Sequence, residues 1–275
     1  MSQRAAAPHE LRAIGLSLGY ADTTIVENLD LEVAPGEVTV IVGANASGKS
    51  TLLRGIARLL RPTAGVVELD GRDIGALPGK RVATVIGLLP QQPLAPDGID
   101  VADLVGRGRY PHQGWLRQWT SADDEIVAEA MTATDTLGLA GRRMEELSGG
   151  QRQRVWIAMA LAQDPDILLL DEPTTFLDVT HQIEVLDLLL ELNRTRGTTV
   201  VMVLHDLNLA ARYADHLVVM RAGRIIANGP PAQTLTADVV HAAFGLDALV
   251  VDDPVCGSPL VVPIGRFHGT PLPAC

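Results

Sequence analysis

Residues 43–50 read Gly-Ala-Asn-Ala-Ser-Gly-Lys-Ser, which is the G-x-x-x-x-G-K-S spacing of a phosphate-binding loop. Glycines in such a loop allow backbone N–H groups to point inward at the β- and γ-phosphates of a nucleotide. Lys49 would supply positive charge, Ser50 would place its hydroxyl on Mg²⁺, and Thr51 would begin a helix whose dipole favours the α-phosphate. The sequence therefore predicts a nucleotide site made by Gly43, Ala44, Asn45, Ala46, Ser47, Gly48, Lys49, Ser50 and Thr51.

Two adjacent carboxylates, Asp171 and Glu172, follow the apolar run 167–170. A run of this kind predicts a buried strand, whose end would hold both acids beside a neighbouring loop. Asp171 suits Mg²⁺ through a water molecule, and Glu172 suits a general base that polarises an attacking water. Acidic strand ends that merely face solvent are common, but two acids opposite a phosphate loop favour the catalytic interpretation.

A second glycine-rich segment, Leu-Ser-Gly-Gly-Gln, occupies residues 147–151 and ends at Gln151. It precedes an apolar pattern that predicts a helix over 150–163. The N–H groups at Ser148, Gly149 and Gly150, together with the dipole of that helix, can face a γ-phosphate. The alternative is a simple helix cap. The two other motifs in the same chain favour a second anion site.

The hydrophobic pattern predicts the elements that would position these groups. Alternation over 10–33 indicates short antiparallel strands, and 37–43 is a buried strand that runs into the phosphate loop. A helix over 49–60 would bury one face made by Leu52, Ile56, Leu59 and Leu60. Further strands are expected at 65–71, 82–90, 167–170, 198–204 and 216–220, with a helix at 180–194.

Between residues 98 and 163 the pattern is helical, with glycine breaks and charged faces and no clear strand. This region is expected to be a helical subdomain inserted into an α/β core. Beyond Pro230 the signals weaken into a short helix and a proline-rich tail.

Composition excludes several kinds of partner. The net charge of −11 disfavours nucleic acid, because neutralising phosphates requires a basic surface, and it also disfavours direct binding to anionic lipid. No apolar run approaches the roughly 18–20 residues that a bilayer-spanning helix needs. Cys256 and Cys275 form no CxxC pattern, so disulfide and zinc interpretations are both weak. We expect a cytoplasmic chain that reaches a membrane by docking on another protein.

The order and approximate spacing of these motifs resemble those in the ATP-binding subunits of ATP-binding-cassette (ABC) transporters. The residues that carry the resemblance are 43–50, Gln91, 147–151, 171–172, Asp178 and His205. The resemblance implies an α/β fold: a P-loop NTPase ABC cassette with a RecA-like core, an N-terminal antiparallel β-subdomain and an inserted helical subdomain. It implies ATP and Mg²⁺ as cofactors. It places the ABC ATPase domain at 10–230, with the helical subdomain at about 98–163, and a short C-terminal extension at 231–275.

The resemblance also assigns roles to single residues. Tyr20 matches the aromatic residue on which adenine stacks, although an ordinary surface tyrosine is the alternative. Gln91 matches the glutamine that contacts Mg²⁺ or the attacking water and signals to the permease, an assignment that the adjacent Gln92 could take instead. Asp178 matches the acidic residue that crosses the interface between two cassettes. His205 matches the switch histidine that hydrogen-bonds the γ-phosphate and holds the water in line.

Residues 147–151 of one subunit are then expected to close on ATP held by the phosphate loop of a second subunit, most simply in a homodimer. Three stretches, 107–112, 174–182 and 252–263, resemble the importers of iron chelates, where ordinary surface is the alternative. The expected partners are an integral-membrane permease docking near 107–112 and, indirectly, a periplasmic or lipid-anchored substrate-binding protein. Among ferric siderophore, haem and cobalamin, the resemblance favours ferric siderophore, with the ATPase on the cytoplasmic face of the membrane. A non-transport ATPase of iron–sulfur assembly, or a regulatory module without turnover, remains the alternative.

Overall fold

A mostly parallel, six-stranded sheet carries the predicted phosphate loop and both carboxylates at the ends of its strands. The computed structural model describes residues 9–91, 93–114, 119–175 and 177–265. The order across this sheet is β10 (Arg224–Gly229), β9 (His216–Arg221), β3 (Val38–Gly43), β8 (Thr199–Val203), β7 (Ile167–Asp171) and β6 (Ile86–Leu89). Only β10 is antiparallel to its neighbour, β9, within this sheet. The carboxyl ends of β3, β8 and β7 therefore lie along one edge, where ligands bind in open α/β sheets.

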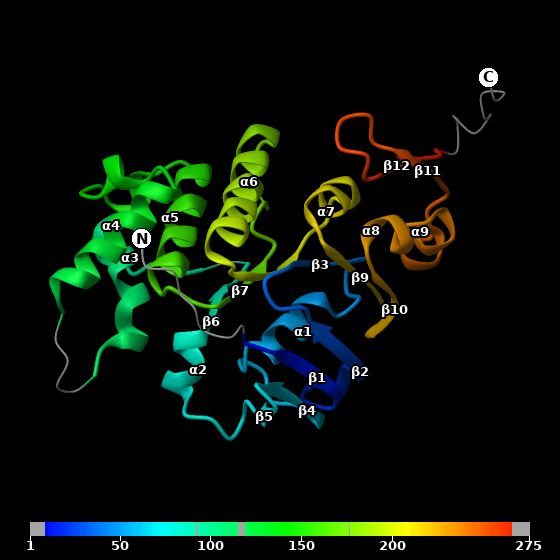
Figure 1. Ribbon diagram of the computed structural model, residues 1–275, viewed down its shortest axis with the longest axis horizontal. Coiled ribbons are helices and arrows are strands. Elements are labelled where there is room, and N and C mark those ends of the chain that lie inside the picture. The colour runs from blue at the N-terminus through cyan, green and yellow to red at the C-terminus, as the bar shows by residue number, and fades with distance from the viewer. Residues whose placement is uncertain (1–8, 92, 115–118, 176, 266–275) are drawn as a thin grey trace.

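Both faces of this sheet are covered, which explains why its strands read as continuous apolar runs rather than as alternating ones. Along β3, Val40 and Val42 pack into one core and Ile41 packs into the other. In Figure 1 the helices α6 (Val179–Arg196) and α7 (Leu207–Tyr213) lie above the sheet, and α1 (Lys49–Ile56) lies below it. The expected buried strands at 37–43, 167–170, 198–204 and 216–220 are confirmed with small shifts at their ends.

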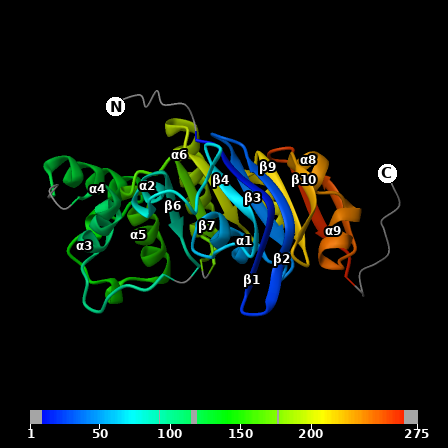
Figure 2. The same ribbon diagram turned by 90° about the horizontal axis from the view of Figure 1, so that it is seen from below.

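A second, antiparallel sheet covers α1 from below. Its order is β2 (Thr23–Val33), β1 (Leu11–Tyr20), β4 (Ala64–Leu69) and β5 (Arg72–Asp73). Pairing of Leu11 with both Val33 and Leu69 sets the register of the three longer strands. The antiparallel strands expected at 10–33 are confirmed, and Figure 2 shows this sheet as a curved layer beside α1.

The first helix ends earlier than the apolar pattern predicts. Leu52 and Ile56 are buried as expected, but α1 stops at Ile56 and Arg58 adopts a left-handed φ of 61°. The backbone N–H groups of Leu59 and Leu60 both donate to the carbonyl of Arg54, so the chain turns away from the helix axis. The expectation that Leu59 lies on the buried face is wrong, because its side chain is 66% exposed.

The stretch 82–90, expected to be one strand, is divided between a helix and a short strand. Helix α2 (Gly79–Val85) buries Val82 and Val85, which are three residues apart and so share one helical face. Within the stretch 82–90, the residues that pair with β7 are those of β6 (Ile86–Leu89). The apolar run is helical in its first half because its buried residues follow the helical period, and a strand in its second half because the sheet offers an edge.

In the part that the structure describes, the region between β6 and β7 consists of helices joined by loops, as expected, with one isolated β-bridge between Asp100 and Arg143. It comprises α3 (Val101–Gly106), α4 (Ser121–Ala133), α5 (Gly149–Ala162) and the 3₁₀ turns η1 (Arg107–His112), η2 (Leu137–Leu139) and η3 (Met144–Glu146). Figure 1 shows these elements on the left, beside the end of the large sheet at β6. Arg109 and Asp123, both buried, form an ion pair of 2.9 Å that joins η1 to α4.

The C-terminal part is more structured than its weak signals indicate. It contains α8 (Pro231–Thr234), α9 (Ala237–Phe244) and a hairpin of β11 (Ala248–Asp252) and β12 (Pro259–Pro263). Neither this hairpin nor β10 was anticipated in the sequence, because strands of five or six residues give little periodic signal, and β12 also has a proline at each end. Across the described ranges, the helices are too short or too polar to cross a membrane.

Candidate functional site

The phosphate loop joins the end of β3 to the start of α1, which is the strand–loop–helix context that its motif requires. A Cβ atom at Gly43 would lie 2.3 Å from the carbonyl oxygen of Met220, so this position has no room for a side chain. Gly48, which precedes α1, has a left-handed φ of 101°. Ala46 adopts a left-handed φ of 63°, a strained geometry for a residue with a Cβ. The loop therefore keeps the backbone path of a phosphate cradle at some local cost.

Lys49 lies across this loop. Its Nζ donates to the carbonyl oxygens of Gly43 at 2.8 Å and of Ala44 at 3.1 Å. Burial lowers the pKa of Lys49 from its usual value, and the charges of Glu172 and Asp171 oppose that effect. The lysine is thus a buried cation beside two carboxylates, and phosphate oxygens can replace the carbonyl oxygens that its ammonium contacts.

Ser50 and Asp171 meet at the base of the site. The Ser50 hydroxyl donates to Oδ1 of Asp171 at 2.8 Å. Burial raises the pKa of Asp171 foremost, whereas the hydrogen bond from Ser50 lowers it. A hydroxyl and a carboxylate are hard oxygen donors, so this pair fits a Mg²⁺ ion bound mainly through water and phosphate oxygens.

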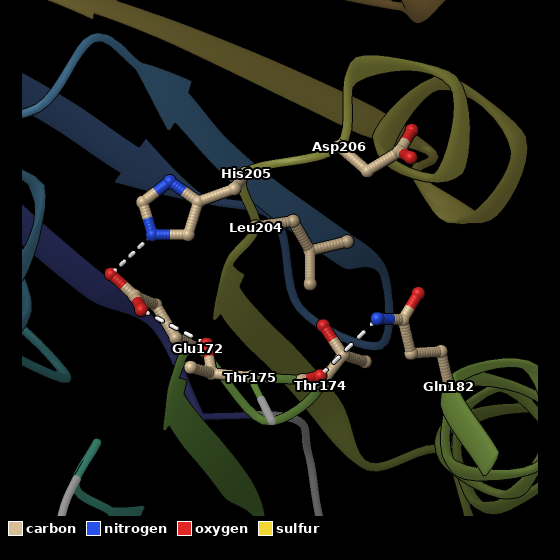
Figure 3. Close-up of a pocket in the computed structure, with 7 residues that line it drawn as sticks. All are labelled: Glu172, Thr174, Thr175, Gln182, Leu204, His205 and Asp206. Atoms are coloured by element: carbon tan, nitrogen blue, oxygen red, sulfur yellow. Dashed lines mark hydrogen bonds and ion pairs between the residues drawn. The ribbon is translucent and has the colours of Figure 1, made fainter. Parts of the chain in front are cut away.

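Glu172 is the centre of a cluster at the ends of β7 and β8. Its Oε1 lies 2.6 Å from Nε2 of His205, and its Oε2 accepts hydrogen bonds from Gln91 Nε2 at 2.6 Å and Thr175 Oγ1 at 3.0 Å. Figure 3 shows His205 and Thr175 reaching the carboxylate from opposite sides. Glu172 itself has a left-handed φ of 55°, which turns its side chain out of the β7 line. A buried carboxylate held in this way can orient a water molecule as a general base.

The same close-up shows the cavity beside this cluster. Its walls come from the end of β7, the segment that leads into α6, and the junction of β8 with α7, with lining residues Glu172, Thr174, Thr175, Gln182, Leu204, His205 and Asp206. Thr175 is a contact that the sequence reasoning missed. A threonine three residues after Glu172, in the turn that follows a buried strand, was the available signal.

The second glycine-rich segment forms the start of α5. Gln151 N donates to Ser148 Oγ at 3.2 Å, and Ser148 N donates to Gln151 Oε1 at 3.0 Å, a reciprocal capping box. Gly149 and Gly150 supply the first helical turn without side chains of their own. Figures 1 and 2 place α5 well to the left of α1, so one chain does not bring this segment to its own phosphate loop.

Asp178 and Tyr20 both lie at the surface. Asp178 caps α6 by accepting from His181 N at 2.9 Å and from His181 Nδ1 at 2.7 Å, and these bonds lower its pKa. Tyr20 ends β1, and Arg54 of α1 donates to its hydroxyl at 3.3 Å. Tyr20 is therefore positioned beside the helix that carries the phosphate loop. Gln92 and Phe176 lie outside the described residues.

A phosphate loop between β3 and α1, paired acids at the end of β7 and a glycine-rich helix start on an inserted helical region together define an ATPase cassette. The ABC transporter family model matches residues 26–175, and the chain belongs to that family. It is an ATP-binding subunit whose family hydrolyses ATP to power transport.

Known proteins resemble this chain over most of its length. The achromobactin transport ATP-binding protein CbrD of Dickeya dadantii (strain 3937) is 54% identical over 251 residues, covering 91% of this chain and 93% of that protein. The ferric enterobactin transport ATP-binding protein FepC of Escherichia coli (strain K12) is 52% identical over 256 residues, covering 93% and 94%. The dimeric bacterial ABC transporter cassette MJ0796 matches with a TM-score of 0.72 and 29% identity, covering 80% of this chain and 98% of that one.

Proposed function

We propose that this chain binds Mg²⁺-ATP and hydrolyses it to power uptake of an iron chelate, foremost a ferric siderophore, through a membrane permease. The observation that carries this proposal is the cluster of His205, Gln91 and Thr175 on Glu172, together with the Ser50–Asp171 pair beneath Lys49. Two relatives more than half identical to the chain are named for transport of achromobactin and of ferric enterobactin. Their names support the choice of cargo.

The phosphate loop binds the nucleotide and orients its γ-phosphate. Backbone N–H groups of 43–48 and of the first turn of α1 donate hydrogen bonds to phosphate oxygens. Lys49 Nζ exchanges its carbonyl partners for oxygens of the β- and γ-phosphates. Ser50, Asp171 through water, and Gln91 would hold Mg²⁺. When bound, that ion neutralises charge that develops on the transferred phosphoryl group. Tyr20 would stack on adenine.

Hydrolysis requires Glu172 to accept a proton from water. His205 and Gln91 occupy its two oxygens, so a water must enter between these side chains before the carboxylate can polarise it. His205 then contacts the γ-phosphate and keeps that water in line, which is the positioning that phosphoryl transfer depends on. Gln91, two residues after the end of β6, links this event to the helical region that follows it.

A second copy of the chain completes each site. The capped start of α5, with Ser148, Gly149, Gly150 and Gln151, closes on ATP held by the partner's phosphate loop, and Asp178 crosses between the two. The dimeric relative MJ0796 supports this arrangement. Separation of α5 from α1 within one chain supports it too, because the helix dipole acts on an anion only over its first turn.

The helical region offers the permease a groove between α3, η1 and α4. Tyr110 and Trp119, both exposed, line it together with Arg107 and Asp103. We assign this groove to a cytoplasmic helix of the permease, and under this proposal the chain works at the cytoplasmic face of the membrane. A substrate-binding protein then acts on the other side of the permease and not on this chain. The ATPase domain spans 10–230, with 98–163 inserted and 231–275 as an extension.

Uptake and co-purification test the proposal. Deletion of the gene should abolish uptake of radiolabelled ferric siderophore, and the wild-type gene should restore it, whereas the Glu172→Gln variant should not. Uptake of haem and of cobalamin, measured in the same strains, separates the three cargoes. Recovery of the tagged chain with an integral-membrane partner supports transport. Recovery in a soluble complex with siderophore uptake intact would favour the iron–sulfur assembly alternative.

A further inference from the structure

The C-terminal hairpin, defined as β11, β12 and the turn between them (248–263), is fastened to α7 by two polar anchors. Asn208 Nδ2 donates to the carbonyl oxygen of Val261 at 3.2 Å, and Val261 N donates to Asn208 Oδ1 at 2.7 Å. Arg212 Nη2 donates to Asp253 Oδ2 at 2.6 Å. Asn208 and Arg212 are four residues apart, so one face of α7 carries both anchors.

The hairpin side of these anchors is itself fixed. Val261 is 5% exposed and Asp253 is 6% exposed, so the hairpin residue in each contact is buried. Asp253 Oδ1 accepts from Val255 N at 2.8 Å, which closes the turn between the strands while Oδ2 holds Arg212. The hairpin therefore presents a rigid edge to the helix rather than a loose tail.

Helix α7 begins immediately after the switch histidine. Asp206 caps it by accepting from Asn208 N at 2.8 Å and Leu209 N at 2.9 Å, and His205 directly precedes this cap. The other end of α7 is tied to α6, where Tyr213 donates to Asp187 Oδ1 at 2.7 Å. In the first turn of α7, the side chain of Asn208 contacts the hairpin. Asn208 is three residues after His205, so a movement of that turn would also displace the backbone that carries the His205 ring.

We propose that the C-terminal hairpin is a positioning element for ATP hydrolysis: by holding the first turn of α7, it keeps His205 Nε2 against Glu172 Oε1. Asn208 is the positioning residue, and the Arg212–Asp253 pair supports it from the next turn. The inference rests on the roles proposed above for Glu172 and His205. It gives the extension beyond residue 230, which lies outside the matched range 26–175, a part in the reaction.

The test is steady-state ATPase activity of the full-length chain carrying Asn208→Ala. Alanine favours the helix more than asparagine does, so α7 itself should remain formed. Loss of a fixed His205 should lower kcat about tenfold, while KM for ATP stays within about twofold because Lys49 and its loop are untouched. The matched control is Val262→Thr on the outward, 42% exposed side of β12, which should leave kcat unchanged.

Two variants of Arg212 test the second anchor. Arg212→Ala should lower kcat, and Arg212→Lys, which keeps a donor for Asp253, should restore most of it. A lower melting temperature with wild-type kcat in Asn208→Ala would overturn the proposal, as would a raised KM with unchanged kcat. His205→Ala is measured in parallel. If it lowers kcat but Asn208→Ala does not, the hairpin proposal alone fails; wild-type kcat in His205→Ala would overturn the proposed catalytic role and the inference with it.

Discussion

His205 Nε2 lies 2.6 Å from Glu172 Oε1, joining the end of β8 to the end of β7. The contact spans thirty-three positions of sequence, and neighbouring strands bring its two ends together. Because Gln91 and Thr175 hold the other carboxylate oxygen, every acceptor atom of Glu172 already has a partner. The carboxylate is therefore oriented before a water molecule reaches it, which is the condition for an efficient general base.

Glu172→Gln should separate ATP binding from hydrolysis. The amide keeps the shape of the carboxylate but cannot accept a proton, so turnover should fall by about 10² to 10⁴. Binding of labelled ATP should stay near that of the wild type, and a closed dimer should accumulate with ATP, as size-exclusion chromatography can detect. Near-normal ATPase activity in this variant would remove Glu172 from the mechanism.

Lys49→Ala should abolish tight nucleotide binding, because the loop loses the cation that faces the β- and γ-phosphates. The chain offers a well-matched control, since its other lysine, Lys80, is exposed on α2. Equilibrium binding of labelled ATP should weaken at least tenfold, equivalent to about 1.4 kcal/mol, in Lys49→Ala and remain unchanged in Lys80→Ala. Equal affinities for the two variants would contradict the assigned site.

Ser148→Arg should stop turnover while leaving ATP binding to the phosphate loop intact. The bulky cation would obstruct the start of α5 where the partner's γ-phosphate is expected. Mixing this variant with Lys49→Ala tests the shared site directly. A mixed dimer contains one complete site, so activity should reappear although each variant alone is inactive. Mixtures that stay inactive, despite detectable mixed dimers, would contradict a site built from two chains.

Stability should depend on pH through Asp253. Its hydrogen bonds with Arg212 and with Val255 N lower its pKa to about 2, from an unfolded value near 3.9. A depressed folded-state pKa stabilises the protein above the unfolded pKa, and that contribution is lost as the pH falls from about 4 toward 2. Asp253→Asn should therefore lower the melting temperature by a constant amount from pH 7 to 5, with a shrinking difference below pH 4. A difference that does not change with pH would show that charge is not the cause.

Parts of the fold could be predicted because each piece depends on local pattern. The strand before Gly43, the helix after Lys49 and the strand that ends at Asp171 follow from apolar runs and turn residues. The expectation of a single strand failed in the stretch where helical and strand patterns compete. The run 82–90 changes from helix to strand at Ile86 because only 86–89 meet the edge of β7. The hairpin at 248–263 depends on contacts with α7 that lie about forty to fifty residues away along the chain.

The sequence by itself determined the chemistry available: a lysine in a phosphate loop, paired acids, a glycine-rich helix start and a late histidine, in an order that resembles one family. Tertiary structure decided which groups meet. Parallel pairing of β7 with β8 brings Glu172 to His205, and β6 beside β7 brings Gln91 to the same carboxylate. The same structure sets α5, whose start is capped by Ser148, apart from α1 within one chain, as Figure 1 shows. These contacts follow from strand order and helix placement, which arise from burying both faces of one sheet and which local pattern does not encode.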